Sequence, residues 1–195
     1  MMRIISGSAR GTRLATLEGE STRPTLERVK EALFSMIQFE ISGARVLDLF
    51  SGSGQLALEA LSRGAASADA VDSSSAAIAV ITKNIKATHM ENKCSIRRMT
   101  AEGFLQTNAG RREYDLVFLD PPYAKGLIPD ALTRLHSGKM LSDGATVVCE
   151  LAASDGEEDI LNSPVLCECF TVRKNASYAR ARVIILDYVG GNRHE

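Results

Sequence analysis

The chain has 195 residues, of which 45% are hydrophobic and 24% charged, and its formal net charge is −1. These values are typical of a single folded domain, and they exclude a low-complexity chain and a protein that coats nucleic acid indiscriminately. No apolar stretch approaches the length of a membrane span, and the N-terminus lacks a signal-peptide pattern. We therefore expect a soluble cytoplasmic protein, and a monomer.

Residues 1–42 are expected to form an N-terminal extension, followed by the main domain at residues 43–195. Two short β-prone segments, 3–5 and 12–14, flank a turn-rich stretch and predict a small hairpin. A helix is expected to open at Arg23-Pro24-Thr25. Its buried stripe is predicted to be Leu26, Val29, Leu33, Met36 and Ile37, and its solvent side Glu27, Arg28, Lys30 and Glu31.

Strand and helix signals alternate through the main domain. Strands are expected at 45–50, 67–72, 94–99, 114–119 and 145–151, and helices at 55–63, 75–88, 102–108 and 127–136. Two further β-prone runs, 166–173 and 181–189, predict an antiparallel hairpin with a loop at 174–180. The pattern predicts an α/β fold with a doubly wound, mostly parallel seven-stranded sheet. Ligands of such sheets bind at the carboxyl ends of the strands.

The first candidate site is Asp48-Leu49-Phe50-Ser51-Gly52-Ser53-Gly54. The first expected strand runs into a glycine turn that opens a helix, so backbone can approach a ligand closely. The third glycine of the dinucleotide fingerprint is absent, and an Asp ahead of the glycines suits a ligand with an ammonium group. An ordinary tight turn is the alternative.

The second candidate is Asp72, at the end of the second expected strand. A carboxylate there can accept hydrogen bonds from both hydroxyls of a ribose. The alternative is that Asp72 caps the helix that follows.

The third candidate, Asp120-Pro121-Pro122-Tyr123, is the most specific motif in the chain. Pro121 keeps Asp120 out of helical geometry, and paired prolines present carbonyl groups without competing N–H groups. A carboxylate, a carbonyl and an aromatic ring close together suit a planar base whose amino group donates two hydrogen bonds.

Cysteines and basic residues give weaker signals. Cys94, Cys149, Cys167 and Cys169 all lie in apolar, strand-like runs without zinc-ligand spacing, so buried thiols and no metal are expected. Residues 1–17 and 173–182 carry several basic residues and no acid. These two patches fit either a local contact with a polyanion or solvated surface charge.

Taken together, the segments at 48–54, 72 and 120–123 resemble class I S-adenosylmethionine-dependent methyltransferases that modify exocyclic amines. The pattern is most similar to the bacterial 16S rRNA (guanine-N2)-methyltransferases, the RsmD family, with which it shares segments 3–7, 23–25 and 28–31. The resemblance implies a Rossmann-like methyltransferase fold. It also implies methyl transfer from S-adenosylmethionine to the exocyclic 2-amino group of a specific guanine in small-subunit rRNA.

The same resemblance implies roles for individual residues. Cofactor contacts are expected from Asp48, Ser51, Gly52, Gly54, Asp72, Thr100 and Ala101. Asp120, Pro121 and Tyr123 are expected to hold the target base as the catalytic residues. Contacts to RNA, free or in an assembling small subunit, are expected from Arg10, Arg23, Thr25 and Arg180. Two alternatives stay open: a DNA adenine-N6 methyltransferase, which also uses this proline motif, and a non-catalytic nucleotide-binding scaffold for RNA.

Overall fold

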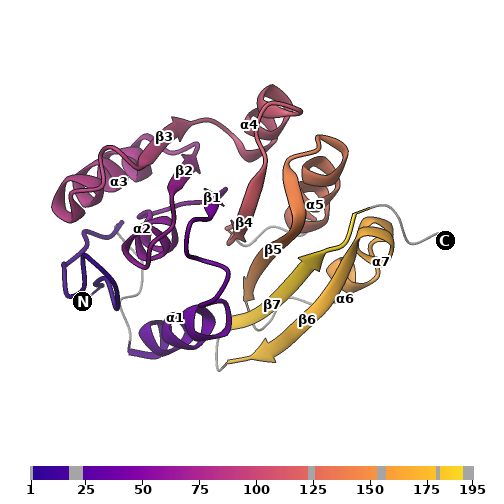
Figure 1. The fold of residues 1–195 in the computed structure, drawn as a ribbon, viewed down its shortest axis with the longest axis horizontal. Coiled ribbons are helices and arrows are strands. Elements are labelled where there is room, and N and C mark those ends of the chain that lie inside the picture. Colours follow the sequence, from indigo (N-terminus) through magenta and orange to yellow (C-terminus); the bar gives the residue numbers. More distant parts are fainter. Residues whose placement is uncertain (1, 18–23, 123–125, 153–156, 179–180, 191–195) are drawn as a thin grey trace.

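A computed structural model of the chain contains one sheet with helices on both faces (Figure 1), and it describes residues 2–17, 24–122, 126–152, 157–178 and 181–190. The strands are β1 (Arg45–Asp48), β2 (Ser67–Asp72), β3 (Cys94–Arg98), β4 (Tyr114–Leu119), β5 (Leu141–Ala152), β6 (Phe170–Ser177) and β7 (Ala181–Tyr188). The helices are α1 (Pro24–Met36), α2 (Gln55–Ser62), α3 (Ser75–Thr88), α4 (Ala101–Asn108), α5 (Leu127–Ser137), α6 (Glu158–Leu161) and α7 (Pro164–Cys169). No described helix is long and apolar enough to cross a membrane.

The sheet has seven strands in the order β3-β2-β1-β4-β5-β7-β6. Strands β1 to β5 are parallel, and β7 pairs antiparallel with both β5 and β6. This confirms the predicted mostly parallel sheet with a C-terminal antiparallel hairpin. The strand order reverses direction between β1 and β4, and such a switch point leaves a crevice outside the carboxyl ends of the strands.

Two hydrophobic layers cover the sheet. One layer contains the buried side chains of α1, α2, α3 and the N-terminal segment, packed on Val46, Phe118 and Val148. The other contains those of α4 to α7, packed on Leu47, Val117 and Cys149. Neighbouring residues of one strand fall in opposite layers because side chains alternate along a strand. The long apolar runs of β1 and β4 follow from this burial on both faces.

The N-terminal arm (residues 2–17) forms the predicted hairpin as a single antiparallel bridge, between Arg3 and Arg13. Glu59 of α2, which is fully buried, holds the arm by accepting hydrogen bonds from the backbone N–H groups of Ile5 (2.8 Å) and Ser6 (3.0 Å). The arm therefore shares one core with the sheet. The predicted division between residues 1–42 and 43–195 stays a prediction.

Three sequence-based expectations about local structure were wrong. Lys30 is buried, because its ammonium group donates to the Arg3 carbonyl (2.9 Å) and lies 3.6 Å from Glu59 Oε2. The expected strand at 166–173 starts as helix α7, since Ser163 and Pro164 form a helix start with proline in the first turn. Cys167 is exposed on that helix, whereas the other three cysteines are buried.

Candidate active site

Three acidic residues lie at the carboxyl edge of the sheet, around the switch point. Asp48 ends β1, Asp72 ends the neighbouring strand β2, and Asp120 directly follows β4 on the other side of β1. Asp48 is in register with Phe118 of β4, two residues before Asp120, and the Leu49 N–H donates to the Phe118 carbonyl (3.2 Å). Residues that are far apart in the sequence are thus brought together, as the sequence predicted from the parallel arrangement.

Asp48 is a buried carboxyl group with unused hydrogen-bonding capacity. Its side chain is 1% exposed, and Oδ2 accepts a hydrogen bond from the Ala57 N–H (3.2 Å). Oδ1 is buried and has no partner among the described residues. Burial raises the pKa of Asp48 to about 7, and the nearby charge of Asp72 adds to this shift. A cationic group that reached Oδ1 would satisfy the free oxygen and favour the ionised carboxylate.

The glycine turn after β1 is held in shape by Asp72. The Asp72 carboxylate accepts hydrogen bonds from the Gly52 N–H (2.9 Å) and from the Ser74 N–H (2.8 Å). Gly52 and Gly54 have φ angles of 53° and 76°, in the left-handed region that favours glycine. The Ser51 hydroxyl donates to the Asp48 carbonyl (2.7 Å), which ties the turn to the strand.

Asp72 and the start of α4 lie next to each other at the carboxyl edge of the sheet. Helix α3 is capped by Ser74, so Asp72 is not the helix N-cap, and its carboxylate oxygens retain lone pairs that can accept hydrogen bonds from a ribose. Thr100 caps α4 by accepting a hydrogen bond from the Gly103 N–H (3.1 Å), and Ala101 begins the helix. The Met99 N–H donates to the Asp72 carbonyl (3.1 Å), so this segment lies beside Asp72.

The proline motif continues the carboxyl end of β4. Asp120 and Pro121 are half-buried and Pro122 is exposed. The expected site residues Tyr123, Arg23 and Arg180 lie outside the described residues, and so does the side chain of Thr25. The remaining expected RNA contact, Arg10, is exposed on the N-terminal arm.

The profile of the family described as "Conserved hypothetical protein 95" matches residues 2–186. The chain belongs to this family. It is 40% identical over 150 residues to a Bacillus subtilis relative named "Putative rRNA methyltransferase YlbH", across 76% of this chain and 82% of the relative. It is also 35% identical over 155 residues to "Ribosomal RNA small subunit methyltransferase D" of Escherichia coli, across 80% of this chain and 77% of that protein. The resemblance found in the sequence is confirmed.

Solved structures of other proteins share the fold of this chain. The structure described as "Putative methyltransferase yhhF from Escherichia coli" matches with a TM-score of 0.81 and 28% identity, over 97% of this chain and 98% of that one. A structure described as a "putative sam-dependent methyltransferase from Streptococcus mutans" matches with a TM-score of 0.65 at 17% identity, over 82% and 48% of the two chains. The latter likeness concerns the fold alone. The predicted class I methyltransferase architecture is thereby confirmed.

One acidic residue of the candidate site was missed in the sequence. Glu150 lies in β5, and the β4–β5 pairing ends with Leu119 opposite Cys149, one residue before Asp120 and Glu150. The sequence offered one indication of this residue, since Glu150 directly follows the mostly apolar run 145–149. It carries no motif, because its position beside Asp120 depends on the register of two strands.

Two of the four basic residues of the segment 173–182 are paired with acids within the structure. Arg173 forms ion pairs with Glu40 and Asp187, and Arg182 forms one with Glu157. The absence of acids in the local sequence was therefore misleading, since the partners come from other segments. These two arginines are held by protein carboxylates rather than displayed for phosphate.

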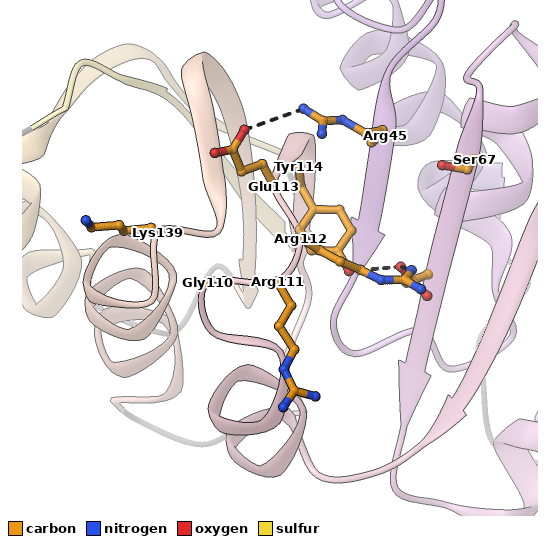
Figure 2. Close-up of a pocket in the computed structure, with 9 residues that line it drawn as sticks. Arg45, Ser67, Gly110, Arg111, Arg112, Glu113, Tyr114 and Lys139 are labelled. Atoms are coloured by element: carbon orange, nitrogen blue, oxygen red, sulfur yellow. Dashed lines mark hydrogen bonds and ion pairs between the residues drawn. The ribbon is translucent and has the colours of Figure 1, made fainter.

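A pocket of about 510 Å³ lies at the opposite, amino-terminal edge of the sheet (Figure 2). Its lining includes Arg45, Arg112 and Tyr114 near the starts of β1 and β4. Asp69 accepts hydrogen bonds from Arg112 Nη1 (2.7 Å) and from the Tyr114 hydroxyl (2.9 Å). Arg45 pairs with Asp115, which holds the pKa of that carboxyl at about 2. These paired charges lie at the amino edge, away from the candidate active site. No group of metal-ligating side chains occurs among the described residues.

Proposed function

We propose that this chain transfers a methyl group from S-adenosylmethionine to the exocyclic 2-amino group of a guanine in small-subunit rRNA. The observation that carries the proposal is the free, buried Oδ1 of Asp48, one strand away from the Asp120-Pro121 motif. A cationic cofactor and a base with an amino group would thus meet at the switch point. The names of the relatives support rRNA as the substrate.

The residues around the glycine turn fit S-adenosylmethionine. Asp48 Oδ1 would accept a hydrogen bond from the cofactor's ammonium group, and Asp72 would accept hydrogen bonds from its ribose. Backbone at Ser51, Gly52 and Gly54 would lie against the methionine end. Thr100 and Ala101, which follow β3, would lie beside the adenine, where the backbone can read its edge. When bound, this cofactor supplies an electrophilic methyl group on a sulfonium.

Asp120 and Pro121 would act on the target base. The amino group of guanine is a poor nucleophile, because its lone pair is delocalised into the ring. The Asp120 carboxylate and the Pro121 carbonyl would accept its two hydrogens, which favours a more tetrahedral nitrogen. Asp120 would also stabilise the positive charge that develops on nitrogen as the new N–C bond forms. Stacking of Tyr123 on the base stays a prediction, worth about 1–3 kcal/mol.

The N-terminal arm is the proposed RNA contact. Arg10 is exposed, and its guanidinium group forms no hydrogen bond or ion pair with another described residue. Arginines in such positions reach phosphates and fix the register of an RNA without reading its sequence. Arg23, Thr25 and Arg180 are retained as proposed contacts from the sequence alone.

Methyl transfer from labelled S-adenosylmethionine to isolated small subunits, to free small-subunit rRNA and to double-stranded DNA tests the proposal. We expect label in RNA and none in DNA. Asp120→Ala should abolish transfer while the affinity for S-adenosylhomocysteine stays within a few-fold, since Asp120 serves the base. Asp120→Asn should give an intermediate loss, because the acceptor oxygen stays and the charge is lost. Asp143→Ala, an exposed position in β5, is the matched control.

Two outcomes would contradict the proposal. Label in DNA and not in RNA would indicate the adenine-N6 reaction. Binding of S-adenosylhomocysteine without transfer to any of the three substrates would indicate a non-catalytic scaffold.

A further inference from the structure

Asp120 directly follows β4, and Glu150 lies in the neighbouring parallel strand β5, two residues before its end. The pairs Phe118–Val148 and Leu119–Cys149 are in register, and they are the last pairs of β4 with β5. Continued by one position, this register predicts Asp120 opposite Glu150. Phe118 and Val148 both face the layer covered by α1, α2 and α3. The alternation of side chains, continued past Leu119, predicts that Asp120 and Glu150 lie on that same face, about 5 Å apart across the strands.

The described residues around Glu150 offer no hydrogen-bond donor to its carboxyl group. Its partner in β7 is Val183, an apolar residue, and the side chain itself is half-buried. No hydrogen bond or ion pair joins the side chain of Glu150 to another described residue, although its backbone pairs with β7. Burial raises the pKa of its carboxyl group.

Two carboxyl groups buried elsewhere in the protein differ from that of Glu150, because they have cationic partners. Glu59 pairs with Lys30 and Arg63, and Asp69 pairs with Arg97 and Arg112. Glu150 shares its lack of a cationic partner with Asp48, which lies at the same edge of the sheet. Perturbed, unpaired acids that gather at one edge are typical of a binding site rather than of a structural network.

We propose that Glu150 selects guanine by accepting a hydrogen bond from its N1–H, while Asp120 and the Pro121 carbonyl accept those of the 2-amino group. This inference rests on the proposed function. Guanine carries the N1–H and the 2-amino group side by side on one edge, so two neighbouring acceptors match it. Adenine carries a lone pair at N1 beside its amino group, so a carboxylate at this place repels adenine. The Asp-Pro motif binds an amino group and does not by itself distinguish the two bases.

A comparison of guanine with 2-aminopurine at the target position distinguishes base selection by Glu150 from a purely structural role of this residue. Both bases carry the 2-amino group, but 2-aminopurine has a lone pair at N1. We would first map the target with the wild-type protein, and then measure kcat/KM on synthetic RNAs with either base at that position. Wild type should prefer guanine by about 100-fold or more, because a site built for an N–H rejects an analogue that lacks it.

Removal of the carboxylate should abolish most of this preference. In Glu150→Ala and Glu150→Gln we expect kcat/KM on guanine to fall by about 10- to 100-fold. The ratio between the two bases should approach one, because Ala has no acceptor and the Gln amide can either accept from guanine N1–H or donate to N1 of 2-aminopurine. The affinity for S-adenosylhomocysteine and the melting temperature report on folding and should stay near wild type in the isosteric Gln variant. Glu168→Gln, an exposed glutamate on α7, is the matched control and should keep the full preference.

The possible failures are distinguishable. Wild type that methylates guanine and 2-aminopurine equally well would overturn the role of Glu150 without any variant, and so would a Glu150→Gln protein that keeps the wild-type ratio. In both cases guanine would still be methylated, so the proposed function would stand. Label on a base other than guanine in the wild-type mapping would overturn the proposed function and this inference together.

Discussion

Replacement of Asp48 by Asn tests whether the buried acid is kept for the cofactor. The substitution keeps the shape of the side chain and the acceptor for the Ala57 N–H, but it removes the ability to ionise. In the free protein the carboxyl group has a pKa of about 7 instead of 3.8, mainly because it is buried. An acid with a raised pKa makes the folded state progressively less stable as pH rises from its unfolded to its folded pKa.

The expected change in the free energy of unfolding follows from this pKa shift. The difference between 3.8 and about 7 corresponds to about 4 kcal/mol of unfolding free energy. Wild type should lose this stability between about pH 4 and pH 7 relative to Asp48→Asn, and the difference should then be constant. Since a cofactor ammonium group would favour the ionised form, wild-type affinity for S-adenosylhomocysteine should fall about tenfold per pH unit below about pH 7.

Urea unfolding and titration calorimetry across this pH range measure both effects. Asp48→Asn should be more stable than wild type at neutral pH, should bind S-adenosylhomocysteine at least about tenfold more weakly there, and should show a flat pH profile of binding. Equal stability of the two proteins at all pH values would refute the argument from burial. A wild-type affinity that does not change with pH would refute the role of Asp48 toward the ammonium group.

Three further predictions concern the cofactor turn, the arm and its anchor. Asp72→Ala and Gly52→Val should each weaken S-adenosylhomocysteine binding in calorimetry, by loss of an acceptor and by obstruction of backbone approach; unchanged affinity in both would mean that the cofactor is misplaced. Combined Arg10→Ala and Arg23→Ala should raise the apparent KM for RNA and reduce its salt dependence by about one phosphate contact each, and an unchanged salt slope would make the arm structural. Glu59→Ala should lower the unfolding free energy in urea by about 3–5 kcal/mol, because it leaves a buried lysine unpaired, and a loss below about 1 kcal/mol would contradict this.

The fold could be predicted largely from the sequence, because its signals are local. Apolar runs of strand length alternate with helical periodicity, and the bounds expected for β2, α3 and β4 agree with the structure. The carboxyl-edge site could be predicted for the same reason, since Asp48, Asp72 and Asp120 each end or directly follow a segment that the sequence marks as a strand. Parallel pairing then places them at one edge without further information.

What the sequence did not reveal depends on contacts between distant segments. Lys30 was expected in solvent because its partner, Glu59, lies on another helix. Arg173 was counted in a basic patch open to a polyanion or to solvent, because Glu40, its partner, lies 133 positions away. Glu150 was missed because its proximity to Asp120 follows only from the register of β4 and β5, which pairs Leu119 with Cys149. Local patterns specify elements, whereas charge pairing and the composition of a pocket are properties of the assembled fold.

The identity of the methylated nucleoside tests the central claim most directly. Small-subunit rRNA would be incubated with the protein and labelled S-adenosylmethionine, digested to nucleosides and separated, with Asp120→Ala as the control. We predict that the label co-migrates with N2-methylguanosine and is absent from the control. Label in N6-methyladenosine or in any other nucleoside, or equal label in the Asp120→Ala sample, would contradict the account.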